Sequence, residues 1–140
     1  MNWLLPAILT AIFYGTYNVF IKLSSGHIHQ IAGALILQIV AALLGTGVLL
    51  FLKIRQVPLE ISSRGIWYAV LAGVFVGLAE IFSFVVFSKG VGVSTGISII
   101  IGGSVVVGAA IGFLFLKESM PPLQLLGLLF IVAGIALVSR

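Results

Sequence analysis

The side chain best placed to do chemistry is a carboxyl group inside an apolar stretch. The chain has 140 residues with three acidic ones among them, and Glu80 is the one that lies inside a long apolar stretch, whereas Glu60 and Glu118 lie in connections between such stretches. It lies eight residues before Ser88, about 12 Å along a helix at 1.5 Å per residue. Away from water the uncharged form of a carboxyl group is favoured, so Glu80 is suited to exchanging a proton for a cation. The alternative is a structural acid that pairs inside a helix bundle.

Four other polar residues are expected at the same depth as Glu80. Tyr14 and Asn18 precede the end of one apolar stretch by about nine and about five residues. Gln38 and Ser98 follow the starts of two other stretches by about seven and about five residues. If the stretches are helices of alternating direction, all five residues form one layer, as a water-accessible binding cavity requires. Alternatively, Asn18 and Gln38 join helices by hydrogen bonds, and the Ser98 hydroxyl bonds its own helix backbone.

A cation and several aromatic rings lie close to this layer. Lys22 follows Asn18 by four residues, so both occupy one helix face. Its ammonium either extends to the membrane interface or acts as the counter-ion of Glu80. Aromatic rings can bind a cationic or aromatic ligand, with ordinary packing or lipid contact as the alternative. The candidate rings are Tyr14, Tyr17, Phe84 and Phe87.

The 17 glycines indicate close packing, because small residues allow apolar helices to approach one another. The expected positions for helix packing or dimerisation are Gly73, Gly77, Gly108, Gly112, Gly127 and Gly134. Adjacent glycines can bend or loosen a helix. Gly102 and Gly103 are therefore expected to form a hinge.

The composition places these residues in a membrane protein. Only 7% of the residues are charged and 61% are apolar, whereas a soluble domain carries about 25% charged residues. The net charge of +4 is not gathered on one face, so a nucleic-acid partner is excluded. Cysteine is absent, and His27 and His29 have no nearby acidic ligand. We therefore expect no metal and no cofactor.

Five apolar stretches are long enough for membrane-spanning helices, which need about 20 residues. They cover residues 3–23, 31–52, 66–88, 93–115 and 122–138. We expect an all-α membrane protein with five transmembrane helices in a single domain, residues 1–140. The first stretch lacks the basic start of a signal peptide and is expected to be a retained helix. Strands of a membrane β-barrel would alternate over about ten residues, which excludes that fold.

The basic residues orient the helices only weakly. With five spans, four basic residues lie on the side of the N-terminus, namely Lys53, Arg55, Arg64 and Lys117. Three lie on the opposite side, namely Lys22, Lys89 and Arg140. Because basic loops stay in the cytoplasm, a difference of one charge permits insertion in both directions and an antiparallel dimer. The alternative is a single orientation set by the long basic loop between Lys53 and Arg64.

Three segments resemble the EamA-type repeats of the drug/metabolite transporter superfamily. They are Ala11–Lys22, Phe87–Ser94 and the stretch from Phe115 to Gly127 that contains Lys-Glu-Ser-Met-Pro-Pro. Members usually carry two inverted five-helix repeats, so the resemblance implies a half-size transporter that pairs with a second copy or a sister protein. The related small multidrug resistance proteins have a working carboxylate eight residues before a terminal Lys. Here that position is Tyr14, which leaves Glu80 as the candidate.

Taken together, these features predict a transporter of small metabolites or cationic, drug-like compounds in a bacterial-type inner membrane. We expect proton-coupled export by alternating access, with Glu80 as the proton site. One alternative is a flippase for a lipid-linked carrier, or a subunit of one, in which Lys22 matters more than Glu80. Another is a scaffold that holds other helices. Enzymatic activity is not expected, because a lone carboxylate lacks an acid–base partner.

Overall fold

The computed structural model describes residues 3–139, and in this range all regular structure is helical. Arg140, one of the charges counted above, lies outside the described residues. The helices are α1 (Leu4–Ser25), α2 (Gln30–Ile54), α3 (Ser63–Ser88), α4 (Val93–Leu114) and α5 (Pro122–Val138). The expected stretches agree with these bounds to within three residues. The all-α prediction is thus confirmed for the described residues.

Local sequence signals set the ends of these helices. The His29 side chain accepts a hydrogen bond from the Ile31 N–H and caps α2, and Ser62 caps α3 through the Gly65 N–H. Such caps satisfy N–H groups that have no partner inside the helix. At the start of α5, Pro122 occupies the first helical position, where its missing N–H costs nothing.

Four of the helices, α1 to α4, are long and apolar enough to cross a membrane. The fifth, α5, is an apolar helix of 17 residues. At 1.5 Å per residue it is about 25 Å long, somewhat shorter than a hydrocarbon core of about 30 Å. The helix predicted at residues 122–138 is therefore present, and it is the shortest of the five.

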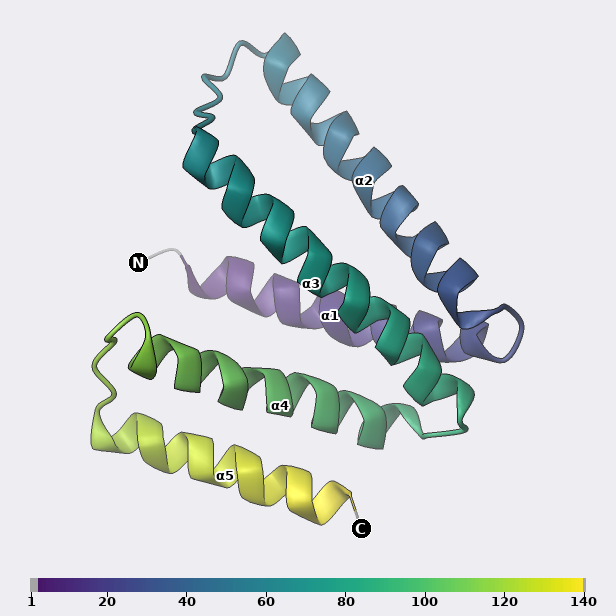
Figure 1. Cartoon of the computed structure of the whole chain (residues 1–140), viewed down its shortest axis with the longest axis vertical. Coiled ribbons are helices and arrows are strands. Elements are labelled where there is room, and N and C mark those ends of the chain that lie inside the picture. The colour runs from purple at the N-terminus through teal and green to yellow at the C-terminus, as the bar shows by residue number, and fades with distance from the viewer. Residues whose placement is uncertain (1–2, 140) are drawn as a thin grey trace. The chain divides into compact units, whose positions relative to one another are not determined.

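The chain divides into two compact units. The central unit is Ile21–Lys89, and the terminal unit combines Met1–Phe20 with Gly90–Arg140. In the central unit α2 and α3 pack against each other, and in the terminal unit α4 and α5 do so (Figure 1). Each pair is an antiparallel hairpin, and the two are described separately below.

Candidate functional site

The α2–α3 hairpin is held by two side chains that each lie against a glycine of the other helix. The Phe84 ring covers Gly33, where an added Cβ would lie 2.8 Å from Cζ. The Gln38 amide covers Gly77, where an added Cβ would lie 3.3 Å from Oε1. Both contacts depend on the register of α2 against α3. A larger residue at either glycine would push the two helices apart. On α3 they flank Glu80, three residues after Gly77 and four before Phe84.

Glu80 lies on the buried face of α3. Its exposed fraction is 5%, and Ser83, Phe84 and Phe87 are buried as well. The spacing of three, four and seven residues after Glu80 places all four on one side of the helix. The neighbouring Phe82 is 64% exposed. These four residues form a polar and aromatic stripe on the buried face of α3, and Glu80 is its first residue along the chain.

Lys22 reaches the end of α3 from the end of α1. Its ammonium Nζ donates a hydrogen bond of 3.1 Å to the carbonyl oxygen of Phe87. The last carbonyls of a helix have no partner inside the helix, and they form the negative end of its dipole. The Lys22 cation therefore bonds a backbone group that favours a positive charge. Its pairing with Glu80 stays a prediction.

On α1, Asn18 is buried, and the nitrogen of its side-chain amide is hydrogen-bonded. Its exposed fraction is 1%, and Nδ2 donates a 2.7 Å hydrogen bond to the Tyr14 carbonyl. This bond fixes the orientation of the amide, since a flip would set two acceptors face to face. Among the described residues Oδ1 has no hydrogen-bond partner. A buried acceptor of this kind costs about 1–3 kcal/mol, so it favours a ligand or water that donates a hydrogen bond.

The tyrosines of α1 form a pair near Asn18. The ring centroids of Tyr14 and Tyr17 are 5.4 Å apart, and the rings are tilted by 57°. This geometry is favourable for aromatic rings. Tyr14 is 47% exposed, so its ring is open to a ligand, lipid or another helix. Phe84 and Phe87, the other expected aromatic residues, are buried in the central unit.

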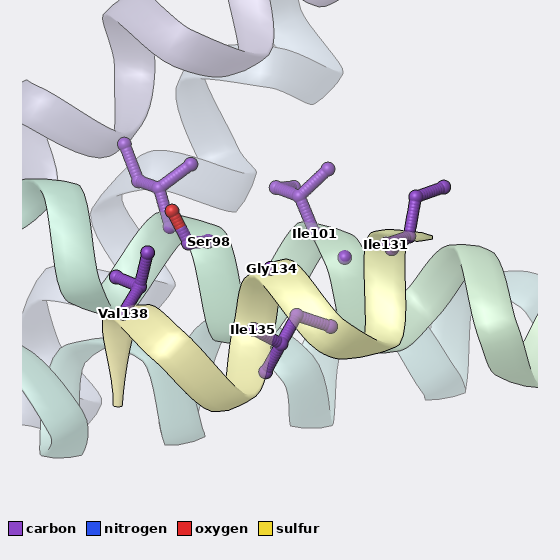
Figure 2. Close-up of a pocket in the computed structure, with 8 residues that line it drawn as sticks. Ser98, Ile101, Ile131, Gly134, Ile135 and Val138 are labelled. Atoms are coloured by element: carbon purple, nitrogen blue, oxygen red, sulfur yellow. The ribbon is translucent and has the colours of Figure 1, made fainter. Parts of the chain in front are cut away.

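In the terminal unit, α4 and α5 border an open pocket of about 380 Å³. Ser98 contributes its polar side chain, and the other lining residues are Ile97, Ile101, Gly102, Ile131, Gly134, Ile135 and Val138. Figure 2 shows the Ser98 hydroxyl among aliphatic side chains of the two helices. An apolar pocket with one hydroxyl has little capacity to select a polar ligand.

The glycines of the terminal unit differ in what lies next to them. An added Cβ on Gly102 would be 2.8 Å from Ile135 Cδ1, whereas Gly103 has open space beside it. Gly112 faces the Glu118 carboxylate, with Oε2 2.6 Å from an added Cβ. Helix α4 is continuous through the Gly102–Gly103 doublet. The expected hinge stays a prediction.

The remaining expected packing glycines have open space where a side chain would begin, within the described part of the chain. An added Cβ would meet nothing within 4 Å at Gly73, Gly108, Gly127 or Gly134. Gly77 is the member of this set that receives a side chain from another helix, through Gln38. Their role in dimerisation also stays a prediction.

The comparison with protein families is decisive for the class of this protein. The EamA-like transporter family matches residues 1–140. The chain belongs to this family. Neither the comparison with curated proteins nor the comparison with solved structures gave a match. The expected resemblance is confirmed, and the family match together with four long apolar helices indicates a multi-pass membrane protein. EamA-like proteins form a transporter family, not an enzyme family.

Of the predicted polar layer of this EamA-like chain, Gln38 and Glu80 belong to the central unit. Tyr14, Asn18 and Ser98 belong to the terminal unit. Within the central unit, the Gln38 amide lies against Gly77, which is one helical turn from Glu80. The layer of all five residues stays a prediction.

Three features of the site were not predicted from the sequence. The first two are Gly33, which receives Phe84, and Ser83, which is buried one turn after Glu80. The i+3 spacing from Glu80 was a signal for Ser83. The third is the Phe87 carbonyl as the partner of Lys22, for which side-chain types give no signal because the acceptor is backbone.

Proposed function

We propose that this EamA-like protein exports small amines or other cationic, drug-like compounds in exchange for protons. The observation that carries the proposal is Glu80, a residue with 5% of its surface exposed on a helix long and apolar enough to span a membrane. An ionisable group inside a membrane is costly to maintain and typically serves function. The same hairpin carries two further polar residues close to Glu80, namely Ser83, one helical turn after it, and Gln38, whose amide lies against Gly77 one turn before it.

The exchange follows from one carboxyl group that serves two ligands. When Glu80 holds a proton it is neutral, and when it releases the proton its carboxylate binds a cationic substrate. The two states exclude each other, so substrate binding and proton uptake are coupled. Asn18 supports an amine substrate, because its Oδ1 is a buried acceptor that an ammonium N–H can satisfy. Tyr14, Tyr17, Gln38 and Ser98 are proposed to line the same cavity, with Lys22 at its margin.

The proposed working unit is an antiparallel dimer in the inner membrane. Two inverted five-helix units that rock around a midplane site give alternating access. The second unit is another copy of this chain or a sister protein. The small charge difference between the two sides supports insertion in both directions. Open faces at Gly108, Gly127 and Gly134 are available for the contact.

Reporter fusions at the C-terminus test the dual orientation. A reporter that is active only in the cytoplasm and one that is active only in the periplasm should both give a signal. Adding two lysines to the loop between Lys53 and Arg64 should abolish one of the signals, because it strengthens the charge difference. Signal on one side alone from the unaltered chain contradicts the antiparallel homodimer.

Proton release in weak buffer tests the exchange itself. Purified protein is titrated with a panel of amines, amino acids and neutral metabolites, and the pH change is recorded for wild type and Glu80→Gln. The matched control is Glu60→Gln, which changes an exposed glutamate in a loop. A cationic ligand should release protons from wild type and from the control, with no release from Glu80→Gln. Release that persists in Glu80→Gln places the proton site elsewhere. No release from any protein favours the flippase or the scaffold.

A further inference from the structure

The carbonyl groups at the end of α3 accept hydrogen bonds from local donors and from one distant lysine. Val85, Val86 and Phe87 carry carbonyl groups at the end of this helix, where intrahelical donors run out. Val85 O accepts from the Ser88 hydroxyl at 2.8 Å, and Val86 O accepts from the Lys89 N–H at 3.2 Å. Phe87 O accepts from Lys22 Nζ at 3.1 Å. The first two donors are local, whereas Lys22 brings a second helix to the end of α3.

All buried residues of the central unit lie near this same end. On α1 they are Ile21 and Ser25, on α2 Gly33 and Ala34, and on α3 Glu80, Ser83, Phe84 and Phe87. No residue from 35 to 79 is buried. The buried part of the central unit therefore lies where α1 ends, α2 begins and α3 ends. Glu80 is the buried α3 residue farthest from that end.

We propose that Lys22 is a positioning residue that keeps this end of the central unit closed and holds water away from Glu80 and Ser83 on that side. This deepens the proposed function, because it assigns one closed side to the exchange at Glu80. In the closed state the ammonium bonds the Phe87 carbonyl and fastens α1 to α3. When this bond breaks, the last turn of α1 is released from α3 and water reaches the stripe of Ser83 and Glu80 from the nearby end.

The charge of Lys22 is essential to this role. An ammonium at a helix C-terminus gains from the helix dipole as well as from the hydrogen bond. The Ser25 hydroxyl donates a 2.9 Å hydrogen bond to the Lys22 carbonyl, which braces the last turn of α1. Lys22 is half-buried, and a lysine side chain carries a long apolar stem, so an apolar side chain of similar length keeps the packing and loses only the bond. That separation makes the role testable.

The chain contains no cysteine, so a single introduced thiol reports on one position. The test places Ser83→Cys in the full chain in detergent and measures its reaction rate with a charged, water-soluble methanethiosulfonate. The rate is compared for Lys22, Lys22→Met and Lys22→Arg. Ser88→Cys, at the exposed end of α3, is the control for reagent access. Melting temperatures of all variants show that each is folded.

With Lys22 present, the thiol at position 83 should react slowly. Lys22→Met should accelerate the reaction by about tenfold or more, the equivalent of one hydrogen bond from a charged group. Lys22→Arg should retain the protection, because a guanidinium also bonds the carbonyl. An unchanged rate in Lys22→Met overturns the proposal, and so does equal acceleration in Lys22→Met and Lys22→Arg. The Ser88→Cys rate should be the same in all three.

A measurement on the unaltered chain covers the case in which Lys22→Met does not fold. Acylation of lysines followed by mass spectrometry compares Lys22 with the exposed Lys53 and Lys89. Slower modification of Lys22 by about tenfold supports its bond to Phe87, and equal rates overturn the proposal. Neither readout requires transport. A failed proton-release experiment with a protected thiol at position 83 would therefore reject the proposed function and leave the closure intact.

Discussion

The two hairpins of this EamA-like protein bring their helices together with different side chains. In the central unit the contacts that link helices include two made by polar groups, Lys22 on the Phe87 carbonyl and Gln38 on Gly77, beside the Phe84 ring on Gly33. In the terminal unit α4 meets α5 through Gly102 and aliphatic Ile131 and Ile135. Polar groups in a membrane are retained where they specify a geometry or do chemistry. Aliphatic contact against glycine gives close approach without selecting a ligand.

From this difference we expect the two hairpins to have separate tasks. The central unit carries the buried carboxyl group, Glu80, and its buried neighbour Ser83. The terminal unit contributes an apolar pocket with the single hydroxyl of Ser98. Helix α5 has no buried residue, so the faces that do not pack on α4 are available to lipid or to another chain. We expect substitutions in the central unit to affect exchange, and those in the terminal unit to affect packing.

The largest expected effect contrasts Glu80 with Ser98. Glu80→Gln should lower proton-driven exchange in proteoliposomes by about 100-fold or more, as expected when a positioned proton-transfer group is removed. Ser98→Ala removes one neutral hydroxyl, which is worth about 1 kcal/mol if it bonds a ligand, and should lower exchange by about fivefold at most. Uptake of the amine identified by proton release provides the measurement. Equal losses of exchange in the two variants would contradict the expected difference between the two hairpins.

An intermediate effect on stability is expected at Gly33. Its added Cβ would lie 2.8 Å from Phe84 Cζ and 2.9 Å from Cδ1, and Phe84 is only 3% exposed. Gly33→Ala should therefore lower the free energy of unfolding by about 1–3 kcal/mol through overpacking. Gly45→Ala is the matched control on the same helix, because its Cβ would meet open space. Unfolding in SDS monitored by circular dichroism gives both values, and equal values would show that Phe84 moves aside freely.

The smallest effect concerns the glycine doublet of α4. Gly103→Ala should stabilise the helix by up to about 1 kcal/mol, since alanine is the better helix former and open space surrounds it. Gly102→Ala has the same gain but meets Ile135, so it should be less stable than Gly103→Ala by about 1–2 kcal/mol. The same unfolding assay measures the difference.

Transport by the double variant tests whether the doublet bends during turnover. Gly102→Ala combined with Gly103→Ala should slow exchange if the doublet is a hinge. Unchanged exchange would leave Gly102 with a packing role alone. It would also support the expectation that exchange depends on the central unit and not on the terminal unit.

Much of the fold was predictable because a bilayer restricts backbone geometry. Every backbone polar group in hydrocarbon needs an internal partner, so long apolar stretches become helices. Polar residues and Pro122 marked the ends of these helices well. The charged connections between α2 and α3 and between α4 and α5 also followed from composition.

The candidate site was only partly predictable. Glu80 could be singled out because an acid in an apolar stretch is conspicuous, and its burial agrees with that prediction. The glycines were harder to interpret, since Gly33 and Gly77 receive side chains whereas Gly73 does not. Small residues look alike in a sequence, and only the rotation of one helix against another decides which of them makes contact.

The sequence by itself determined the helices, the membrane class and the family of this chain, because these follow from local composition and from motifs that are contiguous. The tertiary structure decided which groups meet. The bond from Lys22 to the Phe87 carbonyl joins residues 65 positions apart, and the contact between Phe84 and Gly33 depends on the register of α2 against α3. Side-chain types do not encode such distances, because register results from the packing of whole helix faces.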